Sequence, residues 1–320
     1  MPLEELLVNM METTVRGATA VCKIENGEYI VAVGRKGIFR MKGHQLTSQF
    51  LFPFRIVKLI KVGSLLYGVG ERGVFIRSSD GGLTWSHKFL PTSATIWSVV
   101  ASSKGLVITH GNNSLYFSYD FGFTWSSISP FEKLGNNSPA IRSLCLSRHS
   151  LFIGMKIHRK YGGVWKLDLN SLKLYWIKRE NDFMISSLTV YESQLIAAGG
   201  SCKGSKGRIE TCYLSTRHNN EYFWDALIQI GSQSSFLDVT EDGGYIFVTS
   251  SQDKEGIATV SQIHLEHNII VPCNTVKGHG WRIANDKQDY VVAGHYELKH
   301  SMQAYDLTGT INSNNELVLH

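Results

Sequence analysis

A short apolar phrase that recurs seven times along the 320 residues constrains this chain more than any other feature. Each copy is rich in β-branched or other apolar residues and ends near a glycine or a small polar residue, which predicts a β-strand followed by a turn. Equivalent points in successive copies are separated by 35, 41, 46, 43, 51 and 45 residues. The copies are YIVAVG (29–34), LLYGVG (65–70), LVITHG (106–111), LFIG (151–154), LIAAGG (195–200), YIFVTS (245–250) and YVVAGH (290–295).

Each phrase lies within a longer unit of β-like runs. One run precedes the phrase, as IRSLCLS (141–147) does, another follows it, as GVWKLDL (163–169) does, and a fourth run closes the unit. Four strands that repeat every ~40 to 50 residues are typical of a propeller blade. A lone blade cannot bury both of its faces, so we expect the blades to pack in one ring. The sequence therefore predicts an all-β fold, a single closed β-propeller of seven four-stranded blades.

The predicted propeller domain covers residues 1–320 without an internal boundary. Residues 1–17 form either an N-terminal extension or a strand that closes the ring, and the C-terminal ELVLH is the alternative closing segment. Only residues 3–12 have a pattern that fits a helix. We expect the blades at approximately 18–50, 55–89, 96–129, 141–178, 185–229, 236–273 and 280–320.

Composition fits one large core. Hydrophobic residues make up 43% and charged residues 18% of the chain, a balance that leaves no room for a long disordered arm. The apolar run FLFPF (50–54) is far shorter than the roughly 18 residues of a membrane helix, so membrane insertion is not expected. The first residues, MPLEELLVNMMETT, lack the pattern of a secretory leader. This predicts a cytoplasmic protein, with a virion component as the alternative.

Most of the five cysteines are expected to be free thiols. Cys22, Cys145 and Cys273 lie in apolar runs, where a thiol usually behaves as a small buried hydrophobe. Cys202 and Cys212 bracket the loop SCKGSKGRIETC and would face each other across a hairpin, so a disulfide or a metal clip there stays open. No accompanying histidine and cysteine ligands have metal-binding spacing, and we predict no metal site.

Two segments, SSDGGLTW (78–85) and SYDFGFTW (118–125), match the pattern S-x-D-x-G-x-T-W in full. The aspartate can accept backbone N–H groups of its own turn, the glycine supplies a positive φ, and the tryptophan packs into the core between blades. Because local bonding explains the aspartates, we predict a structural role for them. The structural residues are Ser78, Asp80, Gly82, Thr84, Trp85, Ser118, Asp120, Gly122, Thr124 and Trp125.

These two segments resemble the Asp-box, or BNR, repeats of a β-propeller superfamily that includes sialidases, photosystem II assembly-factor propellers and sorting-receptor propellers. The resemblance covers the second and third blades and implies the architecture rather than an activity. Sialidase resemblance would imply an arginine triad for a substrate carboxylate, a tyrosine nucleophile assisted by glutamate, and an aspartate acid/base. FRIV (54–57) matches part of the sialidase Phe-Arg-Ile-Pro motif at Arg55, but Val57 replaces proline, and seven blades depart from the six of sialidases.

Arginines recur near the starts of the predicted inner strands, around the mouth of the central channel. Aligning IWSV, IRSL, ISSL and WRIA places Trp97, Arg142, Ser186 and Arg282 at one equivalent position. Guanidinium groups there could converge on a carboxylate or a phosphate. The alternative is that they satisfy strand-end carbonyls or pair with neighbouring acids. The predicted channel-mouth site consists of Arg55, Trp97, Arg142 and Arg282.

The loops between the second and third strands of the blades are expected on one face of the ring, opposite the two S-x-D-x-G-x-T-W turns. We call it the loop face, formed by residues 34–37, 70–73, 111–114, 155–163, 200–208, 251–256 and 294–301. These loops contain eleven lysines and arginines against four acidic residues, so they attract anionic partners unless the charge serves only solubility. The predicted basic binding residues are Arg35, Lys36, Arg72, Lys156, Arg159, Lys160, Lys203, Lys206 and Arg208.

No catalytic constellation accompanies the predicted fold. The sequence contains no Walker loop, no G-x-S-x-G elbow and no HExxH motif, and GVGERG (68–73) joins two strands instead of opening a helix. The sequence therefore favours a binding scaffold over an enzyme and predicts no catalytic residue and no cofactor. The expected partner is a protein, with an acidic glycan or a nucleic-acid backbone as further candidates. The alternatives are a sialidase-like propeller that binds or hydrolyses a glycan and a structural component of a phage or secretion assembly.

Overall fold

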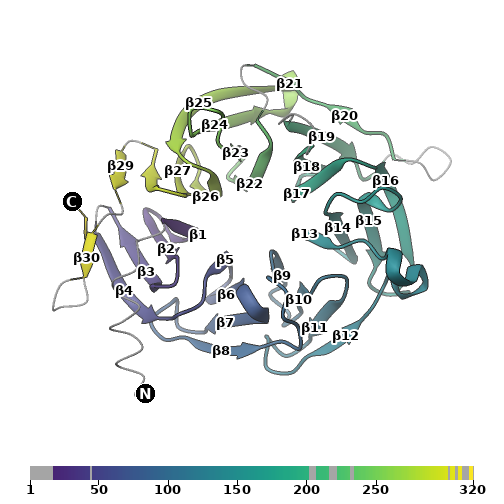
Figure 1. Ribbon diagram of the computed structural model, residues 1–320, viewed down its shortest axis with the longest axis horizontal. Helices are drawn as coiled ribbons and strands as arrows, with labels where there is room; N and C mark the ends of the chain where they lie inside the picture. Colours follow the sequence, from purple (N-terminus) through teal and green to yellow (C-terminus); the bar gives the residue numbers. More distant parts are fainter. Residues whose placement is uncertain are drawn as a thin grey trace.

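The computed structural model describes residues 17–43, 45–201, 207–215, 222–230 and 234–301, and the backbone of strands at 303–306, 309–311 and 317–319. Seven sheets stand around a central channel (Figure 1). In every blade four strands pair in chain order, and the first strand lies innermost (Figure 1). The predicted seven-bladed propeller is confirmed, and each recurring phrase forms the second strand of its blade.

The first four blades follow each other from residue 18 to residue 180. Blade 1 consists of β1 (Ala18–Glu25), β2 (Glu28–Val33), β3 (Gly37–Lys42) and β4 (Gln45–Leu51), and blade 2 of β5 (Ile56–Val62), β6 (Leu65–Gly70), β7 (Val74–Ser78) and β8 (Ser86–Phe89). Blade 3 consists of β9 (Val99–Ala101), β10 (Val107–His110), β11 (Leu115–Ser118) and β12 (Ser126–Ile128), and blade 4 of β13 (Ile141–Ser147), β14 (Ser150–Met155), β15 (Gly162–Asp168) and β16 (Leu174–Glu180).

The last three blades complete the ring. Blade 5 consists of β17 (Phe183–Tyr191), β18 (Gln194–Ser201), β19 (Gly207–Tyr213) and β20 (Asp225–Ala226), and blade 6 of β22 (Phe236–Asp242), β23 (Tyr245–Ser250), β24 (Ile257–His264) and β25 (Ile269–Lys277). Blade 7 consists of β26 (Gly280–Asp286), β27 (Asp289–Gly294), β28 (Glu297–His300) and β29 (Gln303–Asp306). The helical segments of the described residues are the 3-10 turns η1 (Glu71–Gly73), η2 (Glu132–Asn137) and η3 (Leu265–His267). No helix among these residues is long and apolar enough to cross a membrane.

Two blade boundaries differ from those expected. The short strand β21 (Ile228–Gln229) leaves blade 5 and pairs parallel with β25 at the outer edge of blade 6. The fourth strand of blade 5, β20, accordingly spans only two residues. The sheet of blade 7 ends at Asp306, and β30 (Gly309–Ile311) and β31 (Leu317–Leu319) form a separate hairpin beside β4 (Figure 1). Of the expected N-terminal segment at residues 1–17, residues 1–16 lie outside the described part of the chain.

Alternation along β2 shows why each blade needs a neighbour on both sides. Successive side chains of a strand point to opposite faces of the sheet. Tyr29, Val31 and Val33 are buried in the cluster that blade 1 shares with blade 7. Ile30 and Ala32 are buried in the cluster that it shares with blade 2. Because both faces of the sheet are apolar, an arc of blades would leave two such faces in water, and only a closed ring covers them all.

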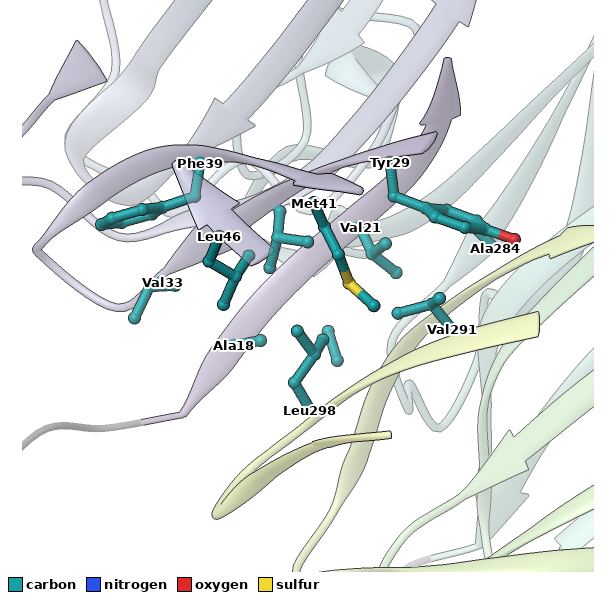
Figure 2. Close-up of a cluster of buried hydrophobic side chains, with 12 residues drawn as sticks. Ala18, Val21, Tyr29, Val33, Phe39, Met41, Leu46, Ala284, Val291 and Leu298 are labelled. Atoms are coloured by element: carbon teal, nitrogen blue, oxygen red, sulfur yellow. The ribbon is translucent and has the colours of Figure 1, made fainter. Parts of the chain in front are cut away.

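Side-chain packing between the first and last blades closes the ring. Met41 and Leu46 of blade 1 lie against Val291 and Leu298 of blade 7, all at most 3% exposed (Figure 2). The N–H of Gly17 also donates to the carbonyl of blade 7's His295 at 3.0 Å. Burial of each large aliphatic side chain contributes about 1.5–3 kcal/mol. Each blade sheet uses strands from one continuous segment, so among the described residues neither end of the chain supplies a strand to a distant blade.

The two S-x-D-x-G-x-T-W turns have the bonding expected of them. Asp80 accepts hydrogen bonds from the N–H of Leu83 at 3.0 Å, the N–H of Thr84 at 2.9 Å and the hydroxyl of Thr84 at 2.5 Å. Asp120 repeats this pattern with Phe123 and Thr124. The aspartates therefore hold the turns between the third and fourth strands, on the face opposite the loop face, which we call the turn face.

Gly122 shows why this turn requires glycine. Its φ of 93° lies in the left-handed region, and a Cβ atom there would approach the ring of Phe75 to 2.7 Å. Trp125 packs edge-on against the same ring, with a centroid distance of 4.9 Å, and its indole N–H donates to the carbonyl of Gly122 at 3.0 Å. Since Phe75 belongs to blade 2, the turn of blade 3 is locked onto its neighbour.

We expect Asp80→Ala to lower the melting temperature, because four donors of the turn lose their acceptor. Hydrogen bonds from Thr84 and Ser78 hold the pKa of Asp80 below its ordinary 3.8. The stabilisation by its carboxylate is therefore present above pH 3.8 and is lost as the pH falls through the lowered pKa of the folded state.

Thermal unfolding of both proteins at pH 7 and pH 3 checks this expectation. The difference in melting temperature should be larger at pH 7, and Asp182→Ala, at an exposed aspartate between blades 4 and 5, should behave like the wild type. An Asp80→Ala protein that melts with the wild type at pH 7 would contradict the role of the turn.

Candidate functional site

A β-bulge recurs at the same point of six first strands, where they line the channel. In each, the pairing register passes over one extra residue, which is Thr19, Val57, Arg142, Ser186, Leu237 or Trp281. Bulges bend a strand and re-aim its side chains. Arg142 is such an extra residue, whereas Arg282 follows one. The sequence alignment that equates these two arginines is therefore shifted by one position at Arg282.

Polar residues at the level of these bulges bind neighbouring blades to each other around the channel. The hydroxyl of Ser98 in blade 3 accepts the N–H of Leu144 in blade 4 at 3.1 Å. The hydroxyl of Ser143 in blade 4 donates to the carbonyl of Ile185 in blade 5 at 2.8 Å. We call this set the polar belt, and its members are Ser98, Ser143, Ser187, Asp238 and Arg282.

Asp238 is the acidic centre of the polar belt and is 1% exposed. Its Oδ1 accepts hydrogen bonds from Lys58 Nζ, Ser187 Oγ and Arg282 Nη1, each at 3.1 Å. Its Oδ2 accepts the N–H of Ile283 at 3.2 Å. Burial alone would raise the pKa of Asp238, but the adjacent Lys58 and Arg282 outweigh burial and hold it below its ordinary value.

Two cations share the single carboxylate of Asp238. Burial lowers the pKa of Lys58, and although Asp238 opposes this, repulsion from Arg282 and Arg142 adds to the decrease. The pKa of Lys58 is thus lowered mainly by burial, whereas the pKa of Asp238 is lowered, against its own burial, by Lys58 and Arg282.

Arg282 spans the channel and joins distant blades. Its Nε donates to the carbonyl of Val57 in blade 2 at 2.6 Å, and its Nη2 donates to the carbonyl of Trp97 in blade 3 at 2.9 Å. Its Nη1 contacts Asp238 of blade 6, and the residue is 4% exposed. Arg282 is therefore engaged in holding the ring together and does not converge with Arg55 and Arg142 on a common ligand position.

Arg142 lies over an aromatic ring. Its guanidinium carbon is 4.2 Å from the ring centroid of Trp97, and the residue is 7% exposed. Its Nη1 has no hydrogen-bond partner among the residues that the structure describes. Burial, with repulsion from Arg282, lowers the pKa of Arg142 to about 9.

His110 and Trp281 support this channel region. His110 is fully buried, and its Nε2 accepts the N–H of Trp97 at 3.2 Å, which fixes the residue beneath Arg142. Burial lowers the pKa of His110 to about 4, so the ring is neutral at pH 7 and adds no charge. Arg55 lies over Trp281, with 5.1 Å between its guanidinium carbon and the ring centroid. Two arginine–tryptophan pairs thus belong to the channel region.

A cavity of about 310 Å³ lies in the channel next to the polar belt. Its lining includes Lys58, Trp97, Ser186, Glu241 and Arg282. This volume is at the lower end of the range of small-molecule pockets. No group of three or more metal-ligating side chains occurs among the described residues. Cys22, Cys145, Cys212 and Cys273 are free thiols, and Cys202 lies outside the described part of the chain.

The predicted basic residues of the loop face differ in availability. Arg72, Arg159 and Lys160 are exposed and form no ion pair within the described part of the chain. Arg35 is 61% exposed and pairs with Glu71 at 3.3 Å. The other described residues of this set, Lys36, Lys156 and Arg208, are partly buried or ion-paired. Lys203 and Lys206 lie outside the described residues.

Burial and ion pairing reduce the contribution of three predicted cations. Lys36 and Lys156 are partly buried, and burial lowers the pKa of both ammonium groups. Arg208 pairs with Glu180 at 2.5 Å and with Glu210 at 2.9 Å. Arg208 therefore belongs to an ion-pair network of blades 4 and 5 and presents little net charge to a partner.

The loop of blade 4 between β14 and β15 is held in a defined shape. Nδ1 of His158 accepts the N–H groups of Lys160 at 3.2 Å and Tyr161 at 3.0 Å, and the two rings of His158 and Tyr161 stack. The indole N–H of Trp165 donates to the carbonyl of Tyr161 at 3.1 Å. Arg159 and Lys160 are consequently presented on an ordered turn.

Sequence reasoning missed Asp238, Lys58 and His110. A signal for two of them exists, because Asp238 interrupts the apolar run FLDV and Lys58 interrupts IVKLI within predicted inner strands. A charged residue in a buried strand needs a partner, which predicts a pairing across the channel. The partner itself could not be predicted, since the two residues are 180 positions apart.

These features define a seven-bladed β-propeller with a basic loop face and a channel that hydrogen bonds and ion pairs of the polar belt cross. The chain is 40% identical over 299 residues to the uncharacterized protein YkuO of Bacillus subtilis (strain 168), an alignment that covers 93% of this chain and 99% of that protein. The chain therefore belongs to the same protein family as YkuO. No family model matches the sequence.

Solved propellers resemble the chain in fold. YCF48 from Cyanidioschyzon merolae has a TM-score of 0.61 and 13% identity, with 89% of this chain and 95% of that chain covered. YCF48 bound to a D1 peptide also has a TM-score of 0.61 and 13% identity, with coverage of 88% and 90%. The GH74 enzyme of Niastella koreensis has a TM-score of 0.67 and 14% identity, with 89% of this chain and 52% of that chain covered.

We expect Asp238→Ala to lower the free energy of unfolding by about 3–5 kcal/mol, because the buried Arg282 and the partly buried Lys58 would lose their shared anion. Urea unfolding at pH 7 measures the change. The double variant Asp238→Ala/Lys58→Met should recover part of the loss, since it removes one of the two uncompensated charges. Equal stability of Asp238→Ala and the wild type would contradict the role of the polar belt.

Proposed function

We propose that this protein is a non-catalytic scaffold that docks a protein partner through its loop face. The observation that carries the proposal is the ordered turn of blade 4, which presents Arg159 and Lys160 in solvent without an acidic partner among the described residues. A cationic side chain on an ordered turn loses little conformational entropy on binding. An acidic protein surface therefore binds it with a smaller loss of free energy than it would bind a mobile loop. We also propose that the two S-x-D-x-G-x-T-W turns are Asp-box turns.

The architecture supports this assignment. Rigid blades hold the loops of one face at set distances from each other, and such loops commonly carry the binding residues of a β scaffold. The propeller fold occurs in YCF48, which has been solved with a D1 peptide bound, and a chain of the mitotic checkpoint complex has a TM-score of 0.64 with this chain. Both are similar in fold alone, and they illustrate protein binding by rings of this kind.

The geometry favours an acidic protein over the other anionic partners. A sialidase-like site would need three arginines around one carboxylate, and Arg282 is already bound to Val57, Trp97 and Asp238. A nucleic-acid backbone is usually bound by a continuous series of cations. Lys36 and Lys156 are partly buried, and Arg208 is ion-paired. The available cations of the described loop face therefore lie at separate positions and do not form such a series.

Charge reversal tests the proposal. We expect the triple variant Lys156→Glu, Arg159→Glu and Lys160→Glu to lose the partner that the wild-type protein captures from its host at low salt. Capture by the wild type should also weaken as salt rises from 50 to 300 mM, about the range in which the Debye length falls from ~14 to ~6 Å. Quantitative mass spectrometry of the captured proteins gives the readout.

A matched control changes the same charge on the opposite face. Lys104, Arg148 and Lys173 are exposed in turns of blades 3 and 4 on the turn face, so their reversal to glutamate should leave capture intact. Both variants should melt near the wild-type temperature. An unchanged set of captured proteins for the loop-face variant would contradict the proposal, as would equal losses for both variants.

A further inference from the structure

The channel holds more buried positive charge than its one central carboxylate can neutralise. Lys58, Arg142 and Arg282 are cations, and Asp238 is the acid that interacts with all of them. Glu241 lines the channel cavity together with Lys58 and Arg282, but it accepts the N–H of Gly244 at 3.0 Å, at the turn-face end of blade 6. Buried charge without a counter-ion is costly, and proteins usually pair it. The channel is therefore short of an anion.

Among these three cations, Arg142 has a hydrogen-bond donor without an acceptor in the described part of the chain. Lys58 and Arg282 both contact Asp238, whereas Arg142 forms no ion pair with any described residue. Its Nη1 is buried and unpartnered, and a buried donor without an acceptor costs about as much as a lost hydrogen bond. A hydrogen-bond acceptor from outside the chain would therefore gain the most binding free energy at this atom.

Stacking prepares the guanidinium of Arg142 to bind an acceptor in its plane. The Trp97 ring covers one face of the guanidinium at 4.2 Å, which leaves the N–H groups at its edges to donate. Trp97 is itself fixed by the buried His110. Arg55 adds a second guanidinium, lying over Trp281 and close enough to contribute to the lowered pKa of Arg142. The position of Arg142 is thus set before any ligand arrives.

We propose that Arg142 binds a carboxylate of the protein partner, an acidic side chain or a chain end that enters the channel mouth. This inference rests on the proposed function and names the chemistry that the partner presents. A carboxylate fits better than a phosphate dianion, because the unpartnered Nη1 group supplies at most two N–H donors, and removing a dianion from water costs more than removing a single charge. The carboxylate would also supply the negative charge that the channel lacks.

Titration calorimetry with a hexaglutamate peptide tests the inference. The full-length protein should bind hexaglutamate more tightly than hexaglutamine, and Arg142→Gln should weaken hexaglutamate binding about tenfold or more, as expected for the loss of a charge-assisted hydrogen bond. Arg148→Gln is the matched control, since this exposed arginine lies at the other end of the same strand, on the turn face. It should bind hexaglutamate like the wild type.

Stability separates a ligand-binding role from a structural one. Without ligand, Arg142→Gln should unfold at or above the wild-type temperature, because it removes an uncompensated buried charge. Arg142→Lys keeps the charge without the planar fork and should bind more weakly than the wild type. Sodium acetate and sodium phosphate, added as competitors of hexaglutamate, identify the preferred anion. Acetate should displace hexaglutamate at a lower concentration than phosphate does.

Three results would overturn the inference: equal binding of hexaglutamate and hexaglutamine, an Arg142→Gln protein that binds hexaglutamate like the wild type, or tighter binding of phosphate than of acetate. Its failure is distinguishable from failure of the proposed function. If charge reversal of the blade 4 loop abolishes partner capture while Arg142→Gln leaves hexaglutamate binding intact, the scaffold proposal stands and the carboxylate site does not.

Discussion

The structure depends on sheets that are apolar on both faces. In β2, Tyr29 and Val31 pack towards blade 7, while Ile30 and Ala32 pack towards blade 2. Such a sheet can be stable only between two others, so the blades must close into a ring (Figure 1). The ring closes by packing of side chains across the junction of the first and last blades (Figure 2). Closure in turn creates the channel and brings loops that are distant in sequence onto one face.

The channel is braced by polar groups where the apolar clusters end. Six first strands carry a bulge at the same level, and beside it hydrogen bonds run from blade to blade. Arg282 adds longer connections, to blades 2, 3 and 6. A buried ion pair contributes little net stability by itself, but it opposes any other arrangement of the groups it joins. The brace therefore keeps the blades in register and holds Trp97 and Arg142 in place.

The sequence was sufficient for the repeating parts of the fold and insufficient for contacts between blades. The recurring apolar phrase predicted all seven second strands, and the bonding of Asp80 and Asp120 follows from eight local residues. The partners of Arg282 could not be predicted, because they lie in three other blades at positions distant from it in the sequence. The ion pair of Arg208 with Glu180 joins strands of two neighbouring blades, β19 and β16, and local sequence does not specify this contact.

We propose that the ring, held by the polar belt, presents its loop face to an acidic protein partner. The most direct measurement is the structure of the protein in complex with a partner captured from its host. We predict that the partner lies over the loop face, with an acidic segment against Arg159 and Lys160 and a carboxylate at Arg142. A partner bound to the turn face or to the outer edges of the blades, with the loop face left in solvent, would contradict the account.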